Sequence, residues 1–292
     1  MAFDTALAEE IWSSKYRYAP SNAQGDGAIE ETWSRVADAI AGAEATDRAD
    51  FFRAQFLEAL RDFKFLPAGR ILAGAGTGRA VTLFNCFVMG AIPDDLSEIF
   101  AHVREAAVTM QQGGGVGMDF SSIRPAGAAV RGVGADASGP VSFMHVWDSM
   151  CRTILSAGQR RGAMMGCLRI DHPDIEAFID AKRDAQHLRN FNLSVLVSDA
   201  FMGALALDRE WPLIFDGVIY RSVKARTLWN KLMRATYDAA EPGAENPARN
   251  PPRYSSTARV IRSAQRAHVS ASRCGWLSQA LRRAVNAVTS SQ

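Results

Sequence analysis

Apolar residues recur at helical spacing near the start of the chain, so residues 1–64 read as helical. One predicted buried face carries apolar residues three or four positions apart: Phe52, Phe56, Leu57 and Leu60. Thr46 or Asp47 can cap this helix, because their side-chain oxygens accept hydrogen bonds from its first backbone amides.

A clear amphipathic helix is predicted after Asp94 and Asp95, which are good capping residues. Its apolar face comprises Leu96, Ile99, Phe100, Val103, Ala107 and Met110. The glycines at 113–115 end this helix, since glycine takes left-handed backbone angles at little cost. A glycine- and arginine-rich loop from Gly117 to Gly139 follows.

Three later helices have start or stop signals of their own. Ser138 and Pro140 open the first, and Pro173 fits the first turn of the second. The third begins at about Ala225, and Gly243 occupies the position of its C-terminal cap.

Strand signals alternate with these helices. Proline and glycine interrupt short apolar runs over residues 65–88, which predicts strands or tight loops there. Residues 193–197 resemble a buried strand, and residues 211–223, with Asp216-Gly217 at the centre, predict a hairpin. The alternation indicates an α/β domain after a helical start.

The composition is that of a soluble globular protein, with 48% hydrophobic and 22% charged residues among 292. No run of about eighteen apolar residues predicts a membrane span, and the first residues lack the features of a signal peptide. The four cysteines are widely spaced and the five histidines never pair at metal-ligand spacing. We therefore expect a reducing cytoplasm and no bound metal.

The net charge of +2 is unevenly distributed. Residues 244–292 contain eight arginines, one glutamate and no lysine or aspartate, which gives +7 and leaves −5 for residues 1–243. This tail reads either as a basic, disordered segment or as translation of a GC-rich gene in a shifted frame, and we favour the second. It has no aromatic interleaving, which argues against nucleic-acid binding.

The chemically suggestive residues are ambiguous when taken alone. The glycines at 113–117 are not followed by Lys-Ser or Lys-Thr, and they end a helix, so they do not form a phosphate loop. Cys86 alone is typical of a small buried hydrophobe. Arginines in glycine-rich loops suit phosphate, although solvated surface loops look the same: Arg124, Arg131, Arg160 and Arg161.

Longer motifs change this interpretation. They are residues 65–72 (FLPAGRIL), 83–87 (LFNCF), 113–117 (GGGVG) and 159–166 (QRRGAMMG). Together they resemble the N-terminal half of a ribonucleotide reductase of the adenosylcobalamin-dependent class. The resemblance implies three parts: an N-terminal helical region (1–64), roughly the first half of a ten-stranded α/β barrel (65–243), and the tail (244–292).

The resemblance also implies roles for residues near a ribonucleotide substrate. Residues 83–86 resemble the first barrel strand, and Cys86 matches one member of the family's redox cysteine pair. Asn85 and Cys86 carry over as substrate-side residues. Gly69 and Gly115 lie where the family's backbone lines the substrate. A thiol beside the ribose 2′ carbon delivers a proton and an electron and ends as a disulfide.

A deoxynucleotide effector site is implied as well. Asp94 matches the family's contact to the effector ribose, and Arg124 and Arg131 match arginines near its phosphates. Gln159, Arg160 and Arg161 match the loop that reports the effector base to the substrate base. Such coupling requires a segment with two arrangements.

The start of the chain, residues 10–17 (EIWSSKYR), resembles the opening of the cobalamin class, and the runner-up is the class whose radical comes from a separate small subunit. The resemblance implies adenosylcobalamin as cofactor and a thioredoxin-type reductant, and it is compatible with a homodimer. No membrane partner is expected.

The family's catalytic loop, Asn-Pro-Cys-Gly-Glu, does not occur in the sequence, nor does a recognisable second redox cysteine. We therefore expect a truncated chain without turnover of its own. Two other readings stay open: a non-catalytic nucleotide-binding fragment that retains effector affinity or associates with a full-length reductase, and a basic-tailed interaction protein that reuses the fold.

Overall fold

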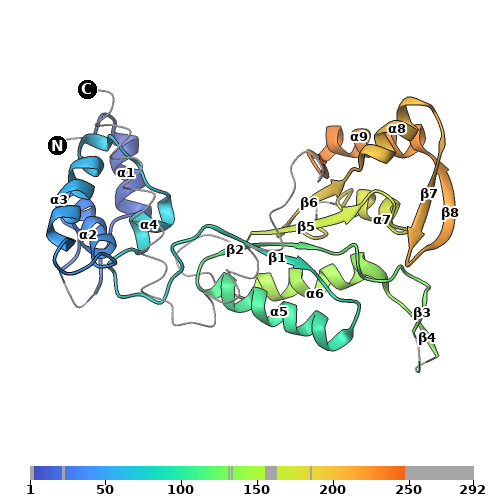
Figure 1. Ribbon diagram of the computed structural model, residues 1–292, viewed down its shortest axis with the longest axis horizontal. Coiled ribbons are helices and arrows are strands. Elements are labelled where there is room, and N and C mark those ends of the chain that lie inside the picture. The colour runs from blue at the N-terminus through green and yellow to red at the C-terminus, as the bar shows by residue number, and fades with distance from the viewer. Residues whose placement is uncertain are drawn as a thin grey trace. The chain divides into compact units, whose positions relative to one another are not determined.

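The computed structural model describes residues 3–21, 24–130, 132, 134–154, 163–184 and 186–246. These residues form two compact units, which meet in the chain between Asn85 and Cys86. The first unit is helical, and the second contains the strands (Figure 1).

The helical unit contains α1 (Ala6–Lys15), α2 (Ile29–Ala41), α3 (Ala49–Leu60), the short 3-10 helix η1 (Arg61–Phe63) and α4 (Gly69–Gly74). The predicted helical start is confirmed. Its core is an apolar cluster that includes Trp33, Val36, Ile40, Phe56 and Leu60, so burial of one face of α2 and α3 stabilises the unit.

Capping of α3 differs from the prediction. Arg48, not Thr46 or Asp47, stands at its N-cap, and no side chain caps the helix. The Arg48 amide instead donates to the carbonyl of Ala45, so Thr46 and Asp47 lie inside a tight turn before the helix.

The prediction of strands or tight loops over residues 65–88 was wrong for residues 69–74, which form α4. Ile71 and Leu72 of α4 and the following Ala75 are buried in the same cluster as α2. Tertiary packing therefore outweighs the low helix propensity of Gly69 and Gly74. It also places residues 65–85 in the helical unit, whereas the sequence pattern changes at Phe65.

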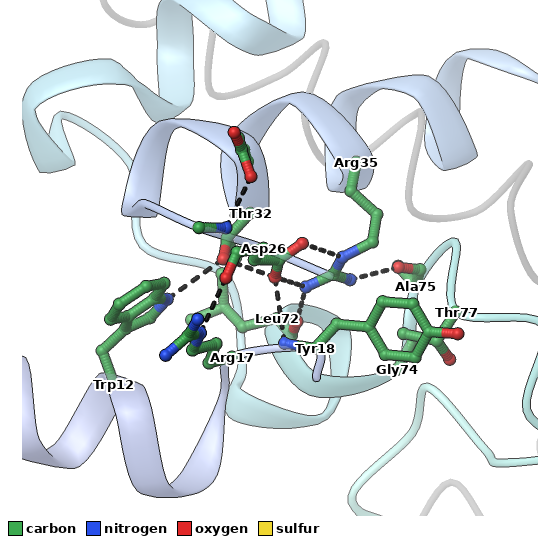
Figure 2. Close-up of polar contacts among 12 residues, drawn as sticks. Trp12, Arg17, Tyr18, Asp26, Thr32, Arg35, Leu72, Gly74, Ala75 and Thr77 are labelled. Carbon is green, nitrogen blue, oxygen red and sulfur yellow. Dashed lines mark hydrogen bonds and ion pairs between the residues drawn. The ribbon is translucent and has the colours of Figure 1, made fainter. Parts of the chain in front are cut away.

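A buried ion pair links the parts of this unit (Figure 2). The guanidinium of Arg35 lies 2.7 Å from Oδ2 of Asp26, and it also donates to the carbonyls of Leu72 and Ala75 beside α4. Asp26 accepts further hydrogen bonds from the Tyr18 amide and the Thr32 hydroxyl. Burial alone would raise the pKa of Asp26, but the hydrogen bonds from Arg35, Tyr18 and Thr32 outweigh it and lower that pKa.

The strand unit is built on a five-stranded sheet in the order β1-β2-β5-β6-β9, in which every neighbouring pair is parallel. The strands are β1 (Cys86–Ala91), β2 (Gly115–Asp119), β5 (Met164–Arg169), β6 (Phe191–Leu196) and β9 (Gly243–Glu245). Parallel neighbours require crossovers, and helices supply them. The α/β prediction is confirmed, and five parallel strands fit roughly half of a ten-stranded barrel.

The crossover helices are α5 (Leu96–Gln111), α6 (Gly139–Thr153), α7 (Ile175–Asp180), α8 (Asp199–Ala206) and α9 (Ala225–Ala239). The sequence signals predicted all but one of these crossover helices, and they missed the helix at Asp199–Ala206. Asp95 caps α5 by accepting the Glu98 amide, as predicted. Helices α5 and α6 pack together, while α7 and α8 both pack on α9 (Figure 1).

Two antiparallel hairpins stand outside the main sheet: β3 (Ala129–Val130) with β4 (Ala135–Asp136), and β7 (Glu210–Phe215) with β8 (Val218–Lys224). The second confirms the predicted hairpin. Asp216 and Gly217 both have positive φ, as a two-residue hairpin turn of the I′ type requires.

Two helix-end predictions were wrong. Gly243 does not cap α9, because Ala240 ends the helix in a left-handed conformation and Gly243 begins β9 beside Ser194. Pro173 lies before the first turn of α7, whose N-cap is Asp174. At Gly243 the chain joins the sheet, whereas at Pro173 it has left β5 and has not yet entered α7.

Candidate functional site

Because the five strands are parallel, their amino ends share one edge of the sheet and their carboxyl ends share the other. The described residues of this unit that are assigned to the substrate lie at one edge, and the described residues assigned to the effector lie at the other. Cys86 and Gly115 begin strands, whereas Asp94 and Arg124 follow strands.

At the amino edge, Cys86 begins β1 directly opposite Gly115, the first residue of β2. The Cys86 thiol is free and exposed. Residues 83–85 precede β1, so the strand expected over residues 83–86 begins at its last residue. An exposed thiol and a residue without a side chain thus stand side by side at the start of the sheet.

The other described cysteines differ from Cys86. Cys151 in α6 and Cys167 in β5 are free but buried. Burial, with a smaller contribution from Asp148, raises the pKa of Cys151 to about 11. Burial, with contributions from Glu245 and Asp119, raises the pKa of Cys167 to about 12. Because the thiolate is the reactive form, neither cysteine is suited to thiol chemistry.

The glycine run is a helix-ending turn, as the sequence predicts. The amide of Gly113 donates to the carbonyl of Met110, and Gly113 has a φ of 90°. A side chain at Gly114 would meet the Phe87 ring at 2.7 Å. Close packing of α5 against β1 explains Gly114, and the assignment of Gly115 to the substrate stays a prediction.

Two predicted substrate-side residues belong to the helical unit. Gly69 begins α4, and a side chain there would meet the Tyr16 ring at 2.8 Å, so packing within this unit favours glycine. Asn85 is exposed and is the last residue of the unit. Their assignment to the substrate stays a prediction.

At the carboxyl edge, the structure brings Asp94 and Arg124 together. Arg124 donates from Nε to Oδ2 of Asp94 at 2.7 Å and from its backbone amide to Oδ1 at 3.1 Å. Both side chains are about three-tenths exposed, at 28% for Asp94 and 29% for Arg124. The pair is therefore ordered yet open to solvent.

The other predicted effector residues, Arg131, Gln159, Arg160 and Arg161, lie outside the described residues. The end of the loop that contains the last three is fixed. The Ala163 carbonyl accepts the Val116 amide at 3.1 Å, and the Met164 amide donates to the Asn190 carbonyl. This loop therefore enters the sheet at the same edge as Cys86.

Sequence reasoning missed His172 and Asp174, which contact the Arg124 segment. The available signal was Asp171-His172-Pro173-Asp174 itself, a polar run between a buried strand and a helix. Such runs at the carboxyl ends of parallel strands commonly form binding sites in α/β proteins. Of these four residues, only Pro173 entered the prediction, as a sign that a helix begins there.

Comparison with known families now adds to this geometry. The profile of the ribonucleotide reductase all-alpha domain matches residues 2–80, and that of the ribonucleotide reductase barrel domain matches residues 84–248. The chain belongs to the ribonucleotide reductase family.

Similar curated proteins include two vitamin B12-dependent ribonucleoside-diphosphate reductases. That of Mycobacterium tuberculosis (strain CDC 1551 / Oshkosh) is 39% identical over 65% of this chain and 28% of its own length. That of Thermoplasma acidophilum is 36% identical over 75% of this chain and 28% of its own. The ribonucleoside-diphosphate reductase subunit alpha of Chlamydia pneumoniae is 24% identical over 72% of this chain and 23% of its own length. The chain thus spans about 28% of the first two relatives.

Among the described residues, no group of three or more histidine, cysteine, aspartate or glutamate side chains is arranged to hold a metal ion. No helix in this part of the chain has both the length and the apolar character to cross a membrane.

Proposed function

We propose that this chain supplies one redox cysteine and the effector site of a cobalamin-dependent ribonucleotide reductase, which reduces ribonucleotides to 2′-deoxyribonucleotides. The observation that carries the proposal is the position of Cys86. Its free, exposed thiol begins β1 opposite Gly115, at the amino edge of the sheet. Asp94 and Arg124 lie at the other edge, so substrate and effector would bind at separate places.

In this proposal Cys86 faces the 2′ carbon of the ribose. Two thiols together supply two electrons and two hydrogens, the 2′ hydroxyl leaves as water, and the thiols end as a disulfide. Cys151 and Cys167 are buried with raised pKa values, so neither is the second thiol. A thioredoxin-type dithiol would reduce the disulfide again, and free cysteines suit a cytoplasmic setting.

The effector is proposed to bind with its phosphates near Arg124. The guanidinium donates to Asp94 from Nε, while the contacts of its Nη1 and Nη2 atoms within the described part of the chain are long, at 3.4 Å to backbone carbonyls. Planar N–H groups in this arrangement suit phosphate oxygens. Arg131 is proposed to lie near the same phosphates. The loop of Gln159, Arg160 and Arg161 enters the sheet at the Cys86 edge, and it is proposed to report the effector base to the substrate base.

Adenosylcobalamin is proposed as the cofactor of the whole reductase because the more similar relatives are named vitamin B12-dependent. Those relatives are 39% and 36% identical, against 24% for the subunit alpha protein. Buried His172 does not fit a cobalt ligand, since one ring nitrogen contacts the Ile123 carbonyl and the other accepts the Asp174 amide. We assign no described residue to the cofactor.

The 292-residue chain is proposed to bind nucleotides without turnover, because Asn-Pro-Cys-Gly-Glu is absent from its sequence. Reduction of a ribonucleotide by the purified chain with adenosylcobalamin and a dithiol would contradict this part of the proposal.

The substrate assignment is tested by alkylating Cys86 with iodoacetamide, with and without a ribonucleoside diphosphate. Mass spectrometry of the modified peptides should show that Cys86 reacts before the buried Cys151 and Cys167 and that the ribonucleotide slows its reaction. Deoxynucleotide alone should protect it less, since Asp94 and Arg124 lie at the opposite edge. Equal reaction rates under all conditions would overturn the placement of substrate at Cys86.

A further inference from the structure

Residues 121–126, which include Arg124, pass between two turns at the carboxyl edge of the sheet. One is the turn between β1 and α5, and the other is the turn between β5 and α7. Strand β2 lies between β1 and β5, so the segment that leaves β2 can contact both neighbours.

Its contacts alternate between the two sides. On the β1 side, the Ser122 hydroxyl donates to the Ile92 carbonyl, and Arg124 pairs with Asp94. On the β5 side, the Ser121 hydroxyl accepts the Arg169 amide at 2.8 Å, and the Ile123 carbonyl contacts Nε2 of His172 at 2.9 Å. The segment around Arg124 is therefore bonded both to the turn after β1 and to the turn after β5.

The role of His172 follows from its two ring nitrogens. Its Nδ1 accepts the Asp174 amide at 3.0 Å, so in the neutral ring the hydrogen is on Nε2. Nε2 then donates to the Ile123 carbonyl. The side chain is fully buried, so each of these bonds is costly to lose.

Asp174 adds a second anchor three residues further along the segment. Its Oδ2 accepts the Ala126 amide at 2.9 Å. The same oxygen would lie 2.5 Å from a side chain placed on Gly139, where α6 begins. Asp174 stands at the N-cap of α7 but makes no side-chain capping bond there, so its carboxylate is left to bind the Ala126 amide, close to Gly139.

We infer that His172 and Asp174 are positioning residues for the effector site, because together they fix the backbone that presents Arg124. This inference rests on the proposed function. Neither side chain touches the effector. Each side chain limits the positions that the Arg124 guanidinium can take. An arginine already held in its binding position loses less conformational entropy when it binds phosphate.

The first test measures hydrogen exchange in the full chain without nucleotide. His172→Ala and Asp174→Ala should speed exchange of the Arg124 and Ala126 amides by about tenfold or more. His172→Gln should restore slow exchange at Arg124, since its amide can donate to the Ile123 carbonyl. Amides of the β7–β8 hairpin should stay unchanged. Unaltered exchange at 124 and 126 would overturn the inference.

The second test separates positioning from mere stability. Calorimetry with dATP and dTTP should give affinities about tenfold weaker for His172→Ala and restored for His172→Gln, with thermal midpoints measured alongside. His145→Gln, an exposed histidine in α6, is the matched control. Faster exchange with unchanged affinity would show a structural role only and overturn the inference. If the unmodified chain binds neither nucleotide, the proposed effector site fails, while the exchange data still decide whether the two residues hold this segment.

Discussion

Each compact unit contains an arginine–aspartate pair joined at 2.7 Å, and the two pairs differ in their surroundings. Arg35 and Asp26 in the helical unit have side chains only 10% and 5% exposed, and protein groups bind both of them on several sides. In the strand unit, the exposed fractions of the Arg124 and Asp94 side chains are 29% and 28%, about three times those of Arg35 and Asp26 or more. The same ionic contact thus serves stability where it is enclosed, and can serve ligand binding where it is open to solvent.

The largest effect is expected from removing the enclosed carboxylate. Asp26→Ala leaves the buried Arg35 without a carboxylate partner, although the carbonyls and the Tyr18 ring remain, and this should lower the free energy of unfolding by about 3 kcal/mol or more. Asp38→Ala, which removes the exposed partner of Arg53, should cost at most about 1 kcal/mol. Urea unfolding with hydrogen exchange of α2 and α4 measures both. Equal losses would show that burial does not distinguish these pairs.

The next effect concerns the open pair's supporting residues. Gly139 and Gly127 share a φ of 78°, but only Gly139 has Asp174 and Ala126 against it. Gly127→Ala should cost about 1 kcal/mol from backbone strain alone. Gly139→Ala should cost about 2–3 kcal/mol, since its new side chain also collides with the Asp174 carboxylate. If thermal unfolding shows that Gly127→Ala loses more stability than Gly139→Ala, the close approach of Asp174 to Gly139 at the start of α6 is contradicted.

A smaller effect should depend on pH. Burial lowers the pKa of His172, although the Ile123 contact and Asp174 and Asp171 favour the charged form and Arg169 opposes it. The unfolded chain then binds this proton more readily than the folded chain. The stability from neutral His172 is therefore complete above about pH 6.5 and is lost as pH falls toward the depressed folded pKa. Denaturation at about pH 7.5 and about pH 5.5 measures how far the free energy of unfolding falls between these two pH values. This fall should be smaller for His172→Gln than for the unmodified chain.

Local features of the fold were predictable from sequence. Asp95 caps α5, and Asp216-Gly217 turns the hairpin, because each signal acts over a few neighbouring residues. Helix α4 was missed because its two glycines disfavour a helix, and only the packing of Ile71 and Leu72 on α2 overrides them.

The candidate site was predictable only in part, for a similar reason. Asp94 and Arg124 came from the family resemblance, and their contact joins residues 30 apart in the sequence. The contacts of His172 and Asp174 join residues 49 and 48 apart. No periodicity encodes such pairs. They arise because parallel strands bring the turns after β2 and β5 together.

The central claim is that the open Arg124–Asp94 pair of the strand unit binds a deoxynucleotide, whereas another exposed arginine–aspartate pair, Arg53–Asp38, does not. Calorimetric titration of the full chain with dTTP tests it most directly, using Arg124→Gln and, as the control, Arg53→Gln in the helical unit. We predict saturable binding by the unmodified chain and by Arg53→Gln, and binding weakened by about tenfold or more in Arg124→Gln. Equal affinity in all three proteins, or no saturable binding in any, would contradict the account.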